Sequence, residues 1–170
     1  QLFEGKTLML GHKNIEAPHI APGNILDDTI VDLTWEGEIT WEWRFSDHIE
    51  EMGFSEAALN TMHRNPNIVP AGGGMGDWAH VNSLSKLGPN RCHDAGDVRF
   101  HKDNLIASCR QTNALVIINR RKPHNITWRV GPDYDTSDAL RKLGCIIGPH
   151  HAHMIPRGLP GEGNILVFDN

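Results

Sequence analysis

Two stretches of the sequence repeat one hairpin pattern, and this repeat constrains the fold more than any other feature. The run Thr29–Trp35 is followed by a turn at Glu36-Gly37 and by a second run, Ile39–Trp43. The run Ala114–Arg120 is likewise followed by a turn and by Ile126–Val130, and both second runs begin with Ile-Thr-Trp. Self-similarity on this scale is the signature of an architecture built from repeated units. We therefore expect β-hairpins arranged in tandem.

Short apolar runs separated by Gly, Asn, Asp and Pro fill most of the remaining sequence, which is typical of strands and tight turns. A turn that leads into an apolar strand occurs three times, beginning at Gly5, Asp103 and Gly163. The predicted strands are Thr7–Lys13, Thr29–Trp35, Glu38–Arg44, Trp78–Leu87, Leu105–Thr112, Ala114–Arg121, Ile126–Val130, His151–Pro156 and Asn164–Asp169.

One segment, 47–65, departs from this texture. Its apolar residues, among them Ile49, Met52 and Met62, have helical spacing, and Ser55 is a predicted N-cap. The glycines at 72, 73, 74 and 76 predict a loop after it, and a short helix is expected at Ser137–Leu143.

Laid end to end, these elements give one complete four-stranded unit at 77–131. An incomplete unit at 1–46 and a helical, glycine-rich insertion at 47–76 precede it, and a loop with the start of another unit follows at 132–170. Four-stranded meanders in tandem predict a β-propeller. The expected fold is therefore all-β, a partial propeller of about two to three blades with a helical insertion near 47–65. We expect the missing blades outside this sequence; a small β-sandwich is the alternative. The expected packing anchors between blades are Trp35, Trp41, Trp43 and Trp128.

Composition narrows the class of function. The net charge of −5 with no basic run argues against a nucleic-acid binder. No apolar stretch approaches the roughly 18 residues of a membrane span. The three cysteines, Cys92, Cys109 and Cys145, lack the spacing of a disulfide framework or a zinc motif, and a Cys92–Cys145 pair stays open.

Two histidines and an arginine fall where a propeller gathers its functional groups. The first strand of each blade lines the central channel. His80 lies on the first strand of the complete unit, Arg110 ends its second strand, and His150 enters the first strand of the next unit. The topology therefore predicts that these three side chains converge, although they are distant in sequence.

Such a trio has a definite chemical capacity. A neutral imidazole is a competent nucleophile, and the guanidinium fork matches a tetrahedral oxyanion such as sulfate or phosphate. A second imidazole can donate a proton to a leaving phenolate. The pattern therefore favours transfer of a group from an oxyanion ester, with no cofactor required.

Four segments, taken in order, resemble the arylsulfotransferases. The segments are Trp41-Glu-Trp43 with Asp47-His48, Asp77-Trp-Ala-His80-Val-Asn82, Ser108-Cys-Arg110, and His150-His-Ala-His153 followed by Gly163–Asn170. The family is a six-bladed propeller whose members move sulfate from one phenolic sulfate ester to another phenol. They do so through a covalent sulfohistidine and without a nucleotide sulfate donor.

The resemblance implies roles for individual residues. His150 matches the nucleophile, and His151 is the alternative, because the family motif Gln-His-Asp-Ala is here Pro149-His-His-Ala. His80 and Arg110 complete the implied catalytic set, and the residues assigned to substrate binding are Asn82, His151 and His48. A further family histidine, from an earlier blade, is expected upstream of Gln1.

The implied partners are a phenolic sulfate donor and a phenol acceptor, with no cofactor, nucleic acid or membrane. Relatives of this kind are often exported, so a periplasmic or secreted location is implied, although no signal peptide is visible. Two other functions stay open. One is a non-catalytic binding module; the other is a metal-dependent enzyme using His150, His151 and His153, because a His-x-His pair on a strand puts both rings on one face.

Overall fold

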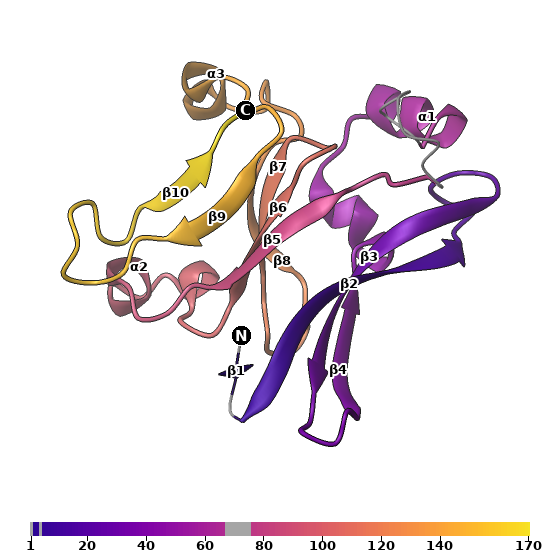
Figure 1. Cartoon of the computed structure of the whole chain (residues 1–170). Helices are drawn as coiled ribbons and strands as arrows, with labels where there is room; N and C mark the ends of the chain where they lie inside the picture. Colours follow the sequence, from indigo (N-terminus) through magenta and orange to yellow (C-terminus); the bar gives the residue numbers. More distant parts are fainter. Residues whose placement is uncertain (1, 4, 67–75) are drawn as a thin grey trace. The chain divides into compact units, whose positions relative to one another are not determined.

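The computed structural model describes residues 2–3, 5–66 and 76–170 (Figure 1). The chain folds as two units, one comprising Gln1–Ile49 and Ser55–Ala79, the other Glu50–Phe54 and His80–Asn170. The described residues form antiparallel sheets with little helix and no closed barrel, which confirms the all-β, partial-propeller class. The predicted loop glycines at 72–74 lie outside the described residues.

The first unit is built on a four-stranded antiparallel sheet in the order β1-β2-β3-β4. Its strands are β1 (Leu2–Phe3), β2 (Lys6–Glu16), β3 (Asn24–Leu33) and β4 (Ile39–Arg44). β3 carries most of the buried residues of the sheet, and it pairs with β2 along its whole length and with β4 over its second half. The first predicted hairpin is confirmed as β3–β4.

Trp35 lies beyond the end of β3, although the predicted strand included it. The turn between β3 and β4 closes at Thr34, whose N–H donates to the Glu38 carbonyl at 2.9 Å, so β3 ends before Trp35. The Trp35 side chain is 94% exposed in consequence. Trp43 does act as an anchor, because it is buried and packs edge-on against Phe45 at 4.8 Å between ring centroids.

The helical segment predicted at 47–65 is confirmed as two helices, η1 (Ser46–Met52) and α1 (Glu56–Arg64). Ser55 is the N-cap of α1, as predicted, since its Oγ accepts the N–H of Ala58 at 3.2 Å. The cap satisfies one of the amide donors that a helix start leaves without a partner.

A buried carboxylate lies at the end of this sheet. Asp27 on β3 is 1% exposed, and Ser46 donates to it twice, from Oγ at 2.6 Å and from its backbone N–H at 3.0 Å. Burial raises the pKa of Asp27, and the hydrogen bonds from Ser46 oppose that rise only in part.

The second unit contains the complete four-stranded meander that the sequence predicts. Its strands are β5 (Val81–Lys86), β6 (Leu105–Cys109), β7 (Ala114–Ile118) and β8 (Ile126–Val130), paired in that order. Every residue of β6 and β7 is buried, because both strands have a neighbour on each side and cover on each face. This is the pattern of a central strand pair in a packed blade.

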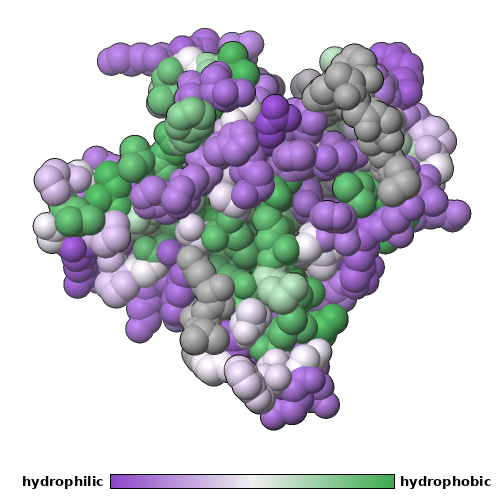
Figure 2. All heavy atoms as spheres, in the orientation of Figure 1, coloured by the Kyte–Doolittle hydropathy of each residue, from purple (hydrophilic) through white to green (hydrophobic). Residues whose placement is uncertain are grey.

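A hairpin of β9 (His150–Met154) and β10 (Ile165–Phe168) follows the meander. β9 lies against β5 and β6 (Figure 1), and its Ala152 and Met154 enter the apolar core that contains Ile106 and Ile117. The hairpin also presents hydrophobic side chains to solvent (Figure 2), with Leu166 and Phe168 more than half exposed.

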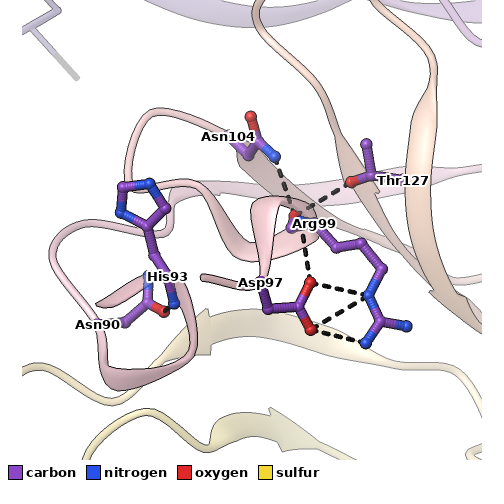
Figure 3. Close-up of polar contacts among 6 residues, drawn as sticks. All are labelled: Asn90, His93, Asp97, Arg99, Asn104 and Thr127. Atoms are coloured by element: carbon purple, nitrogen blue, oxygen red, sulfur yellow. Dashed lines mark hydrogen bonds and ion pairs between the residues drawn. The ribbon is translucent and has the colours of Figure 1, made fainter. Parts of the chain in front are cut away.

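The long loop between β5 and β6 is held by polar side chains (Figure 3). It contains α2 (Arg91–Asp94) and η3 (Val98–Phe100). The buried amide of Asn104 donates to the Arg99 carbonyl at 2.9 Å, as Figure 3 shows. The buried amide of Asn90 donates to the Phe100 carbonyl, also at 2.9 Å. Thr127 of β8 donates to the same Arg99 carbonyl, so the loop is fixed to the sheet at the end remote from His80.

The predicted short helix is confirmed as α3 (Asp138–Leu143), with Ser137 as its N-cap. Among the described residues, Cys92, Cys109 and Cys145 form no disulfide, so the pairing that the sequence left open is not made. In the part of the chain that is described, no helix has the length and apolarity needed to cross a membrane.

We predict that Ile117→Ala lowers the free energy of unfolding by about 2–5 kcal/mol, because it removes a fully buried side chain from the centre of the blade. The matched control is Val98→Ala, a 67% exposed position, where the change stays within about 0.5 kcal/mol. Urea denaturation measures both. Equal losses in the two variants would contradict the assignment of the core.

The raised pKa of Asp27 gives a pH prediction with a definite sign. The folded state favours the protonated carboxyl, so the stability that Asp27 contributes is complete below its unfolded pKa, near 4, and is lost as the pH rises through its folded pKa. Asp27→Asn is therefore expected to gain stability relative to the parent chain as the pH rises above the unfolded pKa of the carboxyl. Urea denaturation at several pH values measures the difference.

The control for this experiment is Asp97→Asn. Hydrogen bonds from Arg99 lower the pKa of Asp97, so its contribution is present above the unfolded pKa and is lost as the pH falls. Relative to the parent, this variant loses stability as the pH rises. A pH-independent difference for Asp27→Asn would contradict the account of the buried carboxyl.

Candidate active site

His80 and Arg110 lie side by side at one end of the second unit. His80 immediately precedes β5 and Arg110 immediately follows β6, and these strands pair with Val81 opposite Cys109. The Arg110 N–H donates to the His80 carbonyl at 3.0 Å, which extends the pairing by one residue. An antiparallel hairpin therefore brings together two residues that are 30 positions apart in the sequence.

The Asn82 side chain ties the entry of β9 to this end of the hairpin. Its Nδ2 donates to the Pro149 carbonyl at 3.0 Å, and its Oδ1 accepts the hydroxyl of Ser108 at 2.7 Å. Asn82 thus links β5, β6 and the residue that immediately precedes His150. Both ends of the Asn82 amide form hydrogen bonds with other protein groups, so its role in substrate binding stays a prediction.

A second tie lies just beyond His150. The Ser83 hydroxyl shares a hydrogen bond with Ser108 and accepts the N–H of Ala152 at 3.1 Å. Main-chain positions on both sides of His150 are therefore held by the same two strands. This arrangement fixes the imidazole at the end of the unit where His80 and Arg110 lie.

Gly148 brings His150 and Arg110 still closer. The His150 ring meets the Gly148 carbonyl through Nδ1 at 2.7 Å. The aliphatic stem of Arg110 passes over the same glycine, since a Cβ placed there would lie 3.9 Å from Arg110 Cγ. His80, Arg110 and His150 are each half-buried, which leaves part of every side chain open to a ligand.

The charge of Arg110 is available to such a ligand. Within the described residues, the Arg110 guanidinium makes no hydrogen bond or ion pair with a side chain or a carbonyl. A guanidinium with donors available can bind a tetrahedral oxyanion. The main chains of His80 and Arg110 and the residue preceding His150 are held at one end of the unit. The convergence of the three side chains and their catalytic roles stay predictions.

His151 and His153 lie beside each other on β9. His151 is exposed, and its ring lies 4.9 Å from that of His153. Both line a small hollow of about 230 Å³ beside Leu166 and Phe168. Across residues 5–66 and 76–170, no three His, Cys, Asp or Glu side chains are arranged to hold a metal ion. For the metal-dependent alternative, the described residues therefore provide two neighbouring imidazoles, those of His151 and His153.

His48 belongs to the first unit. Its ring stacks on Trp43, with centroids 4.3 Å apart and an angle of 11° between the planes. The structure gives His48 a packing partner, and its predicted part in substrate binding is not tested.

Backbone strain collects around the candidate site. Four non-glycine residues in the described chain have positive φ, and three of them are His80 at 50°, Asn113 at 52° and His151 at 52°. Such conformations cost free energy and are often retained at functional sites. Asn113 and Ser83 are not among the site residues that the sequence predicted. The available signal for Asn113 was an asparagine in the turn that follows Arg110, since asparagine tolerates left-handed φ.

Comparison with known proteins gives one match. A sequence model of the family described as Arylsulfotransferase (ASST) matches residues 1–170. No curated protein and no solved structure gives a significant match. The match spans the segments that hold His80, Arg110 and His150.

We predict that Asn82→Ala lowers the free energy of unfolding by about 1–3 kcal/mol, because it leaves the Ser108 hydroxyl and the Pro149 carbonyl without their partner. Ser85→Ala, a polar-to-apolar change on the same strand but outside this network, is the control. Urea denaturation compares the two. A loss no greater than that of Ser85→Ala would show that Asn82 does not hold β9.

Proposed function

Because the chain belongs to the arylsulfotransferase family, we propose that its second unit carries catalytic residues for the transfer of a sulfuryl group between phenols. At the level of the family, the function is of the sulfotransferase type. The observation that supports the finer proposal is the set of hydrogen bonds that joins the main chains of His80 and Arg110 and holds the segment before His150 at the same end of the unit.

The state of the His150 ring supports its role as the nucleophile. A carbonyl oxygen can only accept a hydrogen bond, so the contact with the Gly148 carbonyl requires a hydrogen on Nδ1. The neutral ring then carries its lone pair on Nε2. This favours His150 over His151, whose exposed ring has His153 as its aromatic neighbour.

In the first step, Nε2 of His150 attacks the sulfur of an aryl sulfate. An N–S bond forms, the S–O bond to the aryl group breaks, and its electron pair leaves on the phenolate oxygen. A proton from the His80 imidazolium neutralises that oxygen. Arg110 binds the sulfuryl oxygens through its fork of donors and stabilises their negative charge.

In the second step, an acceptor phenol takes the sulfuryl group from the histidine. Its oxygen attacks the sulfur, the N–S bond breaks, and the electron pair returns to Nε2 of His150. The proton of the acceptor passes to His80, which restores the starting state. Donor sulfate and acceptor phenol are thereby converted to phenol and acceptor sulfate, and the cycle needs no nucleotide sulfate donor.

We expect His150→Ala to reduce transfer from 4-nitrophenyl sulfate to a phenol by roughly a thousandfold or more, because it removes the nucleophile. It should also abolish the labile protein-bound label formed from the ³⁵S-labelled donor. His151→Ala, the adjacent change on the same strand, should retain the label. Rapid-quench labelling measures both variants. A labelled His150→Ala protein, or an unlabelled His151→Ala protein, would refute the assignment of His150.

A further inference from the structure

We propose that Asn113 is a positioning residue for His150, an inference that rests on the function proposed above for that histidine. Asn113 lies in the turn between β6 and β7, and its Oδ1 accepts the N–H of Gly148 at 2.8 Å. Gly148 is in turn the residue whose carbonyl accepts Nδ1–H of His150. One side chain therefore connects the turn that carries Arg110 with the residue that fixes the imidazole.

The peptide that contacts the imidazole is held from both directions. Asn113 holds the N–H of Gly148, and Asn82 holds the carbonyl of Pro149. The Gly148 carbonyl lies between these two anchors. Gly148 itself is buried and has a φ of 55°, a conformation that a glycine adopts without steric cost. With both ends of the segment held, the carbonyl keeps the direction that it needs to accept Nδ1–H.

Asn113 is itself held in place by the protein around it. The Tyr134 hydroxyl donates to the Asn113 carbonyl at 2.8 Å. Burial raises the pKa of Tyr134 to about 12, so the phenol keeps its proton at neutral pH. Gly131 also packs closely here, because a Cβ at that position would clash with the Asn113 carbonyl oxygen.

The same turn also carries the predicted anion-binding group. The N–H of Asn113 points to the Arg110 carbonyl at 3.5 Å, a long hydrogen bond that closes the turn. A displacement of the turn therefore changes the position of Arg110 and the support of Gly148 together. We infer that Asn113 sets which ring nitrogen of His150 carries the lone pair, and that it does so without contacting the substrate.

The test measures the tautomer of His150 directly. ¹⁵N chemical shifts of ¹⁵N-histidine in the full chain, recorded where the ring is neutral, distinguish Nδ1–H from Nε2–H. The parent chain should show the Nδ1–H form. Asn113→Gly removes the acceptor with no strain at positive φ, and it should shift the ring toward Nε2–H. It should also slow single-turnover labelling by about tenfold, the effect of one lost hydrogen bond.

Two further variants separate positioning from general stability. Asn113→Asp keeps an oxygen acceptor and tolerates the same backbone conformation, so it should restore the Nδ1–H form and the labelling rate. Asn119→Gly removes a comparable side-chain hydrogen bond, from the Arg121 N–H at 3.0 Å, in the turn that follows β7. This control should leave the His150 tautomer and the labelling rate unchanged.

The outcomes are distinct from those that test the proposed function. An Nε2–H ring in the parent, or an unchanged tautomer in Asn113→Gly, overturns the role of Asn113. If Asn113→Gly does not fold, Asn113→Asp provides the test. The chemical shift of the Gly148 amide proton must then follow the titration of the introduced carboxylate, because this N–H donates to the side chain at position 113. The absence of such a response overturns the inference. If the tautomer shifts as expected but no label reaches His150 in the parent chain, the positioning role stands and the proposed function fails.

Discussion

The Asn82 side chain is the contact on which the candidate site most depends, because one amide connects three strands. It accepts from Ser108 on β6 and donates to the Pro149 carbonyl at the entry to β9, while its own backbone lies in β5. Apolar contacts of Ala152 and Met154 bring β9 against the meander, but such contacts have no direction. The hydrogen bonds of the Asn82 amide are directional, and they fix the orientation of the start of β9 beside His150.

Apolar and polar side chains have different structural roles in the second unit. The fully buried strands β6 and β7 provide a rigid centre, and each end of the β5–β6 hairpin is closed by buried or half-buried polar side chains. At one end, Asn90 and Asn104 hold a long loop by its carbonyls. At the other, the polar contacts hold the segment that carries His150. Function is expected at the second end, because there a guanidinium and two imidazoles remain accessible.

The strands were predictable because the alternation of apolar and polar residues, the turn residues and the repeated hairpin all depend on the local conformational preferences of the chain. The Ile-Thr-Trp repeat located β3–β4 and β7–β8, and Ser55 marked the start of α1 correctly. The exposure of Trp35 was not predictable in the same way. A two-residue difference in where the turn closes moves that side chain out of the strand, and strand ends are the least determined part of such a pattern.

The candidate site was predicted in part, and the division has a physical reason. The neighbouring positions of His80 and Arg110 follow from the antiparallel pairing of β5 and β6. The predicted place of His150 rests on the expected order of the units, since β9 pairs with β10 alone among the described strands. The roles of Ser83 and Asn113 depend on side chains that reach across strands to single backbone groups, as Ser83 does to Ala152. Distances of this kind depend on the packing of β9 against β5 and β6, which no local pattern in the sequence encodes.

The central claim is that His80, Arg110 and His150 form one binding site for a tetrahedral oxyanion. A crystal structure of the chain with selenate, a sulfate analogue located by its anomalous scattering, tests this most directly. The account predicts one selenate ion bound by the Arg110 guanidinium and within hydrogen-bonding distance of both imidazoles. An Arg110 side chain directed away from both rings, with selenate bound elsewhere or not at all, would contradict it.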